Sequence, residues 1–132
     1  MASDDAPPLP GGKLEYAVLV ALWESGALSA PEIHERVGVP LDLVYTTTTK
    51  VLDRLHRKGL VERQPSGKTF LYAAATERPA TERARARQLL DAVLGDAPRP
   101  ALATLVDAVT SIDPALLDEL ARLVEARRRS RR

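Results

Sequence analysis

Four consecutive threonines, Thr46 to Thr49, stand at the start of a helical pattern that continues through Lys50 and Arg54. Threonine is a mediocre helix former, because its branched Cβ restricts χ1 against the preceding turn. The first turn of a helix also carries unpaired backbone N–H groups and a partial positive charge. Hydroxyl, ammonium and N–H groups gathered at one helix end can bind a polar or anionic surface. The pattern therefore indicates a helix end that meets a surface rather than one that is stable by itself.

The threonines open a helix that we expect from about residue 45 to 58, with Gly59 as its C-terminal stop. Apolar side chains recur on one side of this helix every three to four residues, which is typical of a half-buried helix. The buried stripe comprises Thr48, Val51, Leu52, Leu55 and the aliphatic stem of Lys58, and the polar side comprises Thr46, Thr47, Lys50, Arg54 and Arg57.

Two further helices are expected ahead of it. Residues 13–24 have polar side chains only near the ends, which predicts a core helix wrapped by neighbours, with Trp23 in the core or at a subunit contact. Ser29, Pro31 and Glu32 form the pattern of a capping box with proline in the first turn. The short helix that begins there, at about 30–37, is expected to end at Gly38.

Residues 60–65 and 69–74 alternate like strands on either side of Ser66-Gly67-Lys68, which predicts a β-hairpin. Arg63 and Lys68 make this hairpin basic, and Phe70 and Tyr72 are expected to pack against the helix at 45–58. Three helices followed by a basic hairpin are the layout of a winged helix-turn-helix, which we place at residues 13–75.

The pattern changes after residue 75. We expect one helix at about 81–94, a short one that carries Leu102, Leu105, Val106 and Val109, and a last one capped by Asp113 and Pro114. Three amphipathic helices make a thin core alone, so their apolar stripes are expected to close against a second copy of the chain. The residues expected at this dimer interface are Leu105, Val109, Leu116, Leu117, Leu120, Leu123 and Val124.

Together these patterns predict a mainly α fold with a small β-hairpin, in which a winged helix-turn-helix N-terminal domain precedes a helical dimerisation domain at residues 76–132. Residues 1–12 are acidic and rich in Pro and Gly, so we expect a disordered tail and not a targeting segment. No apolar stretch approaches the ~18 residues that cross a bilayer. We therefore expect a cytoplasmic protein without membrane contact.

The residue types exclude several kinds of chemistry. There is no cysteine, which excludes disulfides, thiol catalysis and cysteine-based metal sites. The two histidines, His34 and His56, have no third ligand of Cys or His type, so we expect structural or phosphate-proximal roles. No Gly-rich phosphate loop or nucleophile elbow is present. Neither an enzyme nor a bound metal or cofactor is expected.

The net charge of +1 conceals two basic segments. Six basic and two acidic side chains lie between residues 43 and 72, where the threonine helix and the hairpin are predicted. A second cluster, RRRSRR, ends the chain and is equally well explained as a solvated face. Basic character is therefore focused where a binding surface is expected.

The sequence resembles the BlaI/MecI family of penicillinase repressors, which are winged-helix dimers. The matching segments are KLEYAVLVALWESG at 13–26, SAPEIHERV at 29–37 and, most specific, YTTTTKVLDRLHRKGLVERQPSGKTFLYAA at 45–74. The resemblance implies a homodimeric repressor that binds a palindromic operator in double-stranded DNA. It also implies that Thr46, Thr47 and Lys50 face the DNA, together with wing residues near Lys68.

Two departures from the family pattern concern the inducing signal. Members from resistance operons are cut by a membrane-bound protease sensor at an Asn-Phe bond in the dimerisation region, but here residues 100–109 read PALATLVDAV and the sequence has no Asn. Copper-responsive relatives carry a cysteine-rich metal hook at the C-terminus, whereas this chain ends in arginines. That cut and copper sensing through thiolates are both excluded.

The highlighted residue types suit DNA. Threonine is short enough for a helix to sit deep in the major groove, and its hydroxyl can bond a phosphate or a base edge. Lys50 can donate to a guanine or a phosphate, while Arg63 and Lys68 are candidate phosphate contacts that supply affinity and salt dependence. Arg54 and Arg57 could reach phosphate or pair with Asp53, Glu62 or another acid.

Two other interpretations are compatible with parts of this pattern. The threonine run could be a frayed helix start whose hydroxyls bond the local backbone. The fold could instead serve protein–protein assembly, which requires neither the exposed threonines and Lys50 nor the charge of the wing. Because those groups are present, we expect a sequence-specific DNA-binding transcriptional repressor.

Overall fold

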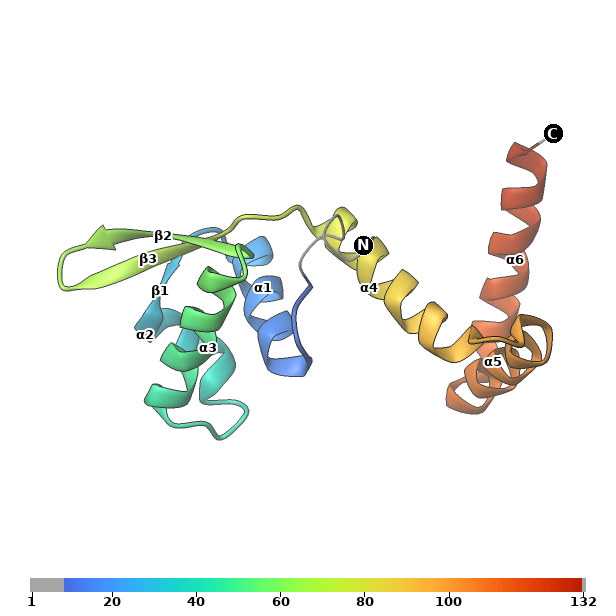
Figure 1. Ribbon diagram of the computed structural model, residues 1–132, viewed down its shortest axis with the longest axis horizontal. Helices are drawn as coiled ribbons and strands as arrows, with labels where there is room; N and C mark the ends of the chain where they lie inside the picture. Colours follow the sequence, from blue (N-terminus) through green and yellow to red (C-terminus); the bar gives the residue numbers. More distant parts are fainter. Residues whose placement is uncertain (1–8, 132) are drawn as a thin grey trace. The chain divides into compact units, whose positions relative to one another are not determined.

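The computed structural model describes residues 9–131, so the tail predicted at 1–12 lies mostly outside the described residues. The chain divides into two compact units, with the boundary between residues 85 and 86 inside a helix. The elements, labelled in Figure 1 except for the π-helical turn η2, are α1 (Lys13–Ser25), β1 (Leu28–Ser29), α2 (Ala30–Ile33), η2 (His34–Gly38), α3 (Tyr45–Arg57), β2 (Val61–Ser66), β3 (Thr69–Ala74), α4 (Arg78–Leu94), α5 (Pro98–Ile112) and α6 (Pro114–Ser130).

The N-terminal unit is a winged helix-turn-helix, as predicted. The helices α1, α2 and α3 enclose one aliphatic core, and the β2–β3 hairpin extends away from them as the wing (Figure 1). Trp23 packs against the rim of this core and donates a hydrogen bond from Nε1 to the carbonyl of Thr76 at 2.8 Å. The fully buried side chains include Val18, Leu19, Ile33, Val51, Leu52, Leu55 and Leu60.

The wing belongs to a three-stranded antiparallel sheet in the order β1-β3-β2. The sequence pattern does not predict β1, which pairs Leu28 with Tyr72 of β3. The expectation that both aromatic residues of β3 pack against α3 is wrong for Phe70. Tyr72 is in the core at 4% exposure, whereas Phe70 is 38% exposed, and the Arg63 guanidinium lies 4.5 Å from its ring centroid.

The predicted capping box opens the second helix. The Ser29 side chain accepts a hydrogen bond from the Glu32 N–H at 3.3 Å, and Glu32 Oε1 accepts one from the Ser29 N–H at 2.9 Å. The helix changes into the wider turn η2 at His34 and ends at Gly38, as predicted. A Cβ on Gly38 would lie 2.5 Å from Thr48 Oγ1 and closer still to His34 Nδ1, so glycine permits the close approach of η2 to α3.

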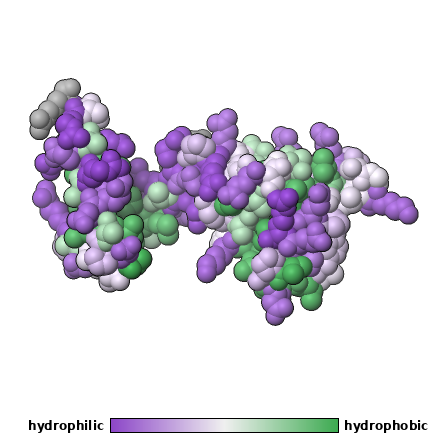
Figure 2. All heavy atoms as spheres, turned by 180° about the vertical axis from the view of Figure 1, so that it is seen from behind, coloured by the Kyte–Doolittle hydropathy of each residue, from purple (hydrophilic) through white to green (hydrophobic). Residues whose placement is uncertain are grey.

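The C-terminal unit is built from the remainder of α4 and an α5–α6 hairpin. Asp113 caps α6 as predicted, because its Oδ1 accepts a hydrogen bond from the Ala115 N–H at 3.0 Å. The predicted range of α4 was too short, because α4 begins at Arg78, and α5, predicted as a short helix, has 15 residues from Pro98 to Ile112. No described residue of α5 or α6 is buried, and hydrophobic side chains reach the surface of these helices (green, at the left of Figure 2). The fold is thus mainly α with a small sheet.

Candidate nucleic-acid interface

The N-terminal end of α3 has no capping side chain. Val44 occupies the N-cap position with an extended backbone, and its side chain is 66% exposed. Valine has no oxygen that could accept a hydrogen bond from the first N–H groups, whereas Ser29 performs this role for α2. The first turn of α3 therefore begins with a surface-exposed apolar group and backbone donors that lack a side-chain cap.

The hydroxyls of the four threonines have different roles. Thr48 is buried, and its Oγ1 lies 2.7 Å from His34 Nδ1, which confirms that this threonine turns inward. The Thr49 hydroxyl donates a hydrogen bond to the carbonyl of Thr46 at 3.0 Å. For this threonine, the alternative in which the hydroxyl bonds the local backbone is therefore observed. Within the described part of the chain, the hydroxyls of exposed Thr46 and half-buried Thr47 have no hydrogen-bond partner. These two hydroxyls are the ones left to meet a ligand.

The four cations expected at DNA fall into two pairs. Lys50 on α3 and Lys68 at the tip of the wing are exposed, and neither forms an ion pair with any residue between 9 and 131. Arg54 and Arg63, in contrast, each contact an internal carboxylate. Two of these cations are therefore unengaged and two are held in place.

Arg63 joins the wing to α3. Its Nη1 lies 3.1 Å from Oδ1 of Asp53, and its guanidinium covers the ring of Phe70. Asp53 is one of the acids considered above as a partner for Arg54, but it pairs with Arg63 instead. This contact restrains the wing relative to α3.

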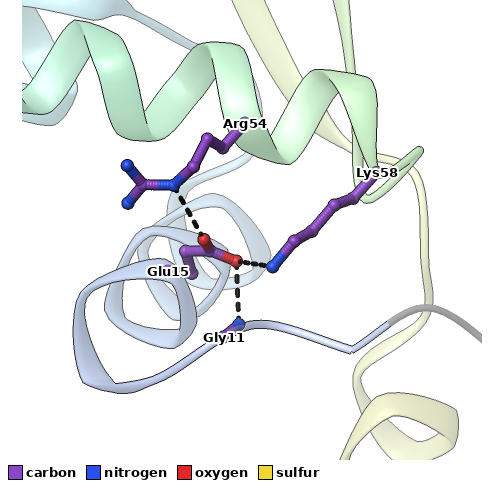
Figure 3. A network of polar contacts seen from close by, with 4 residues as sticks. All are labelled: Gly11, Glu15, Arg54 and Lys58. Carbon is purple, nitrogen blue, oxygen red and sulfur yellow. Dashed lines mark hydrogen bonds and ion pairs between the residues drawn. The ribbon is translucent and has the colours of Figure 1, made fainter.

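Arg54 is held by a buried carboxylate on α1. Glu15 is 3% exposed, and its Oε2 accepts a hydrogen bond from Arg54 Nε at 3.2 Å (Figure 3). Its Oε1 accepts hydrogen bonds from Lys58 Nζ at 2.7 Å and from the Gly11 N–H at 2.8 Å. The network links residue 11, α1 and two successive turns of α3.

The Glu15 carboxyl is stabilised in its ionised form. Burial raises its pKa, but the hydrogen bond from the Gly11 N–H and those from Lys58 and Arg54 lower the pKa by more. The net pKa is below the ordinary value of a glutamate. Two cations and one backbone donor therefore compensate the desolvation of this charge.

The family is shown by the sequence as a whole. Residues 11–126 match the model of a protein family described as the penicillinase repressor, and the matched range contains both units of the fold. The chain belongs to the penicillinase repressor family. Its members are transcriptional regulators, and the chain is accordingly a DNA-binding repressor.

Several solved structures are similar to the repressor. The PcaV transcriptional regulator from Streptomyces coelicolor in complex with its natural ligand is 24% identical, with a TM-score of 0.49 over 86% of this chain and 82% of that one. A mutant MarR from E. coli complexed with operator DNA is 23% identical, with a TM-score of 0.45 over 83% and 72%. No curated protein matches the repressor. Family membership therefore follows from the match over residues 11–126.

Two residues of the interface are not predicted by the sequence pattern. Glu15 stands in an apolar helix near its polar end, and nothing nearby in the sequence indicates that it binds Arg54 and Lys58. His34 is expected to be structural, but its specific partner Thr48 is not foreseen.

In the part of the chain that the structure describes, no group of His, Asp or Glu side chains could hold a metal ion. No described helix has the length and apolar character of a membrane span.

Proposed function

We propose that the repressor acts as a homodimer on a palindromic operator, with α3 in the major groove and the β2–β3 wing along the phosphate backbone. The observation that carries this proposal is the N-terminal end of α3, where Thr46, Thr47 and Lys50 are unengaged and no side chain caps the helix. In such an arrangement a helix end can approach base edges closely and bind phosphate with its free N–H groups.

The individual residues would serve two purposes: reading residues contact the base edges, and anchoring residues contact the phosphates. Exposed Thr46 and Lys50 and half-buried Thr47 lie on the first turns of α3 and would contact base edges. Lys68 at the wing tip would contact phosphate, with Arg54 and Arg63 as further phosphate contacts. Reading residues would determine the base preference, and an anchoring residue that forms no ion pair among the described residues, such as Lys68, would contribute to the salt dependence without discriminating between sequences.

The homodimer is supported by the apolar side chains of the C-terminal unit. Leu116, Leu123 and Val124 of α6 are 43%, 50% and 45% exposed, and Leu102 and Ile112 of α5 are exposed as well. Leu105, Val109, Leu117 and Leu120 are only half-buried. A second copy of the chain would cover this surface, and two-fold symmetry of the protein would require an operator of two inverted half-sites.

The test is fluorescence-anisotropy binding to DNA from upstream of the protein's own gene. A scrambled duplex of equal length is measured alongside, each at several salt concentrations, and the number of chains per duplex is determined by sedimentation. Tight, sequence-dependent binding by two chains is the expected result. Equal weak binding to both duplexes that vanishes with salt would overturn the proposal and favour the protein–protein assembly role.

A further inference from the structure

We propose that Glu15 is a positioning residue for DNA binding, which holds Arg54 so that the outer edge of its guanidinium meets a DNA phosphate. The inference rests on the proposed function, because it requires the exposed side of α3 to face DNA. It assigns a role in binding to a buried residue of α1 that cannot itself reach the ligand.

The orientation of Arg54 is the first reason. Its Nε is bound to Glu15 Oε2, while its two terminal nitrogens point away from the carboxylate (Figure 3). Its side chain is 48% exposed, and the terminal nitrogens have no other acceptor among the described residues. Arg54 also follows Lys50 by one helical turn, so both cations lie on the same side of α3. The guanidinium thus presents free donors next to the proposed reading surface.

The second reason is that the two carboxylate oxygens of Glu15 bind different donors. Lys58 and the Gly11 N–H both use Oε1, so the whole of Oε2 is available to Arg54. Lys58 and Gly11 already link α1 and the N-terminal segment to the last turn of α3. In addition, the bond to Arg54 fixes one guanidinium, which lies four residues closer than Lys58 to the N-terminal end of α3.

The third reason is the energetic cost of ordering an arginine. A free arginine side chain loses much rotamer freedom when it binds, and a planar guanidinium held beforehand loses less. A fixed guanidinium also matches a phosphate at only one register of the helix in the groove. Glu15 therefore favours the specific complex, whereas loosely bound random DNA gains nothing from the fixed geometry.

On random DNA, the negative charge of Glu15 weakens binding instead of strengthening it. The carboxylate offsets part of the positive charge of Arg54 and Lys58. Glu15→Gln removes that negative charge and releases Arg54, so attraction to any DNA is kept or increased while the geometry is lost. A role in stability alone would instead lower the active fraction and weaken both kinds of binding equally.

The experiment compares wild type, Glu15→Gln, Arg54→Ala and the double variant on the upstream duplex and the scrambled duplex. We expect Glu15→Gln to lower the ratio of the two affinities by about tenfold, mainly through the upstream duplex. In the Arg54→Ala background the same substitution should leave the ratio unchanged. Glu62→Gln is the matched control: it removes an acid from the same basic segment, and it should alter both affinities by the same factor.

Arg54→Lys decides the outcome if Glu15→Gln does not fold. Lysine keeps a cation within reach of Glu15 but has no second edge to offer, so the affinity ratio should fall as in Arg54→Ala. A folded Glu15→Gln with the wild-type ratio, or an Arg54→Lys variant with that ratio, would overturn the inference. Wild-type protein that does not discriminate between the duplexes would instead overturn the proposed function itself.

Discussion

His34 Nδ1 lies 2.7 Å from Thr48 Oγ1, and this hydrogen bond joins the turn η2 to α3. The His34 ring also makes an edge contact with the ring of Tyr45, the first residue of α3, with 5.4 Å between the ring centroids. Gly38 permits both contacts because it has no Cβ. One residue of the second helix thus fixes the first turn of the helix that we propose reads DNA.

The His34–Thr48 bond yields a prediction on stability. Thr48→Val keeps the shape of the side chain but removes the partner of a part-buried imidazole, so we expect the free energy of unfolding to fall by about 1–3 kcal/mol. Urea unfolding measures the change. Thr49→Val is the control: its hydroxyl bonds only the backbone of its own helix, and the change should stay within about 0.5 kcal/mol. Equal effects of the two substitutions would show that the bond to His34 contributes little.

Lys68 provides a prediction on salt dependence. It lies exposed at the tip of the wing, where a phosphate contact needs charge more than shape. Lys68→Ala should weaken binding to the upstream and scrambled duplexes by similar factors and lower the slope of log affinity against log salt by about one. Gln64→Ala, an uncharged change in the same hairpin, should leave the slope unaltered. A loss confined to the upstream duplex would make Lys68 a base-reading residue.

Leu123 tests the proposed dimer. It is 50% exposed in the single chain, so Leu123→Asp disturbs little within the C-terminal unit but would bury a charge in a dimer interface. Light scattering should then show monomers, and binding to the upstream duplex should be lost. Ala115→Asp, which adds the same charge to α6 outside the apolar stripe, should stay dimeric. A dimeric Leu123→Asp protein would place the interface elsewhere.

Glu15 makes stability depend on pH in a defined direction. Its pKa in the folded protein is below the ordinary value of 4.5, despite the opposing effect of burial, because Gly11, Lys58 and Arg54 donate hydrogen bonds to the carboxylate. A group of this kind contributes stability that is complete above its unfolded pKa and is lost as the pH falls through its folded pKa. The difference in unfolding free energy between wild type and Glu15→Gln should therefore be constant above about pH 5.5 and shrink below about pH 4.5. Urea unfolding at a series of pH values measures it, and a difference that grows on acidification would contradict the pairing.

Local signals explain why much of the fold is predictable. The capping box of Ser29 and Glu32, the stop at Gly59 and the cap at Asp113 each depend on neighbours within a few residues, and all three appear as specific hydrogen bonds. The outward position of Thr46 and Lys50 likewise follows from helical periodicity alone.

The remaining features depend on contacts between distant residues. Glu15 is separated from Arg54 and Lys58 by 39 and 43 residues, so its burial cannot be read from its own helix. The strand β1 has two residues and exists only through its pairing with β3. Phe70 shares the face of Tyr72 but lies farther out on the wing, which extends beyond the helices (Figure 1). Periodicity shows which side of a strand faces inward, but not where the core ends.

Selection from a pool of random duplexes tests most directly whether α3 reads base sequence through its first turns. Wild type and Lys50→Ala are each carried through the selection, and the enriched sequences are compared. We expect wild type to enrich an inverted repeat, and Lys50→Ala to lose the base preference at the same position of both half-sites together with about 1–3 kcal/mol of affinity. No enriched sequence for wild type, or an identical preference for both proteins, would contradict this expectation.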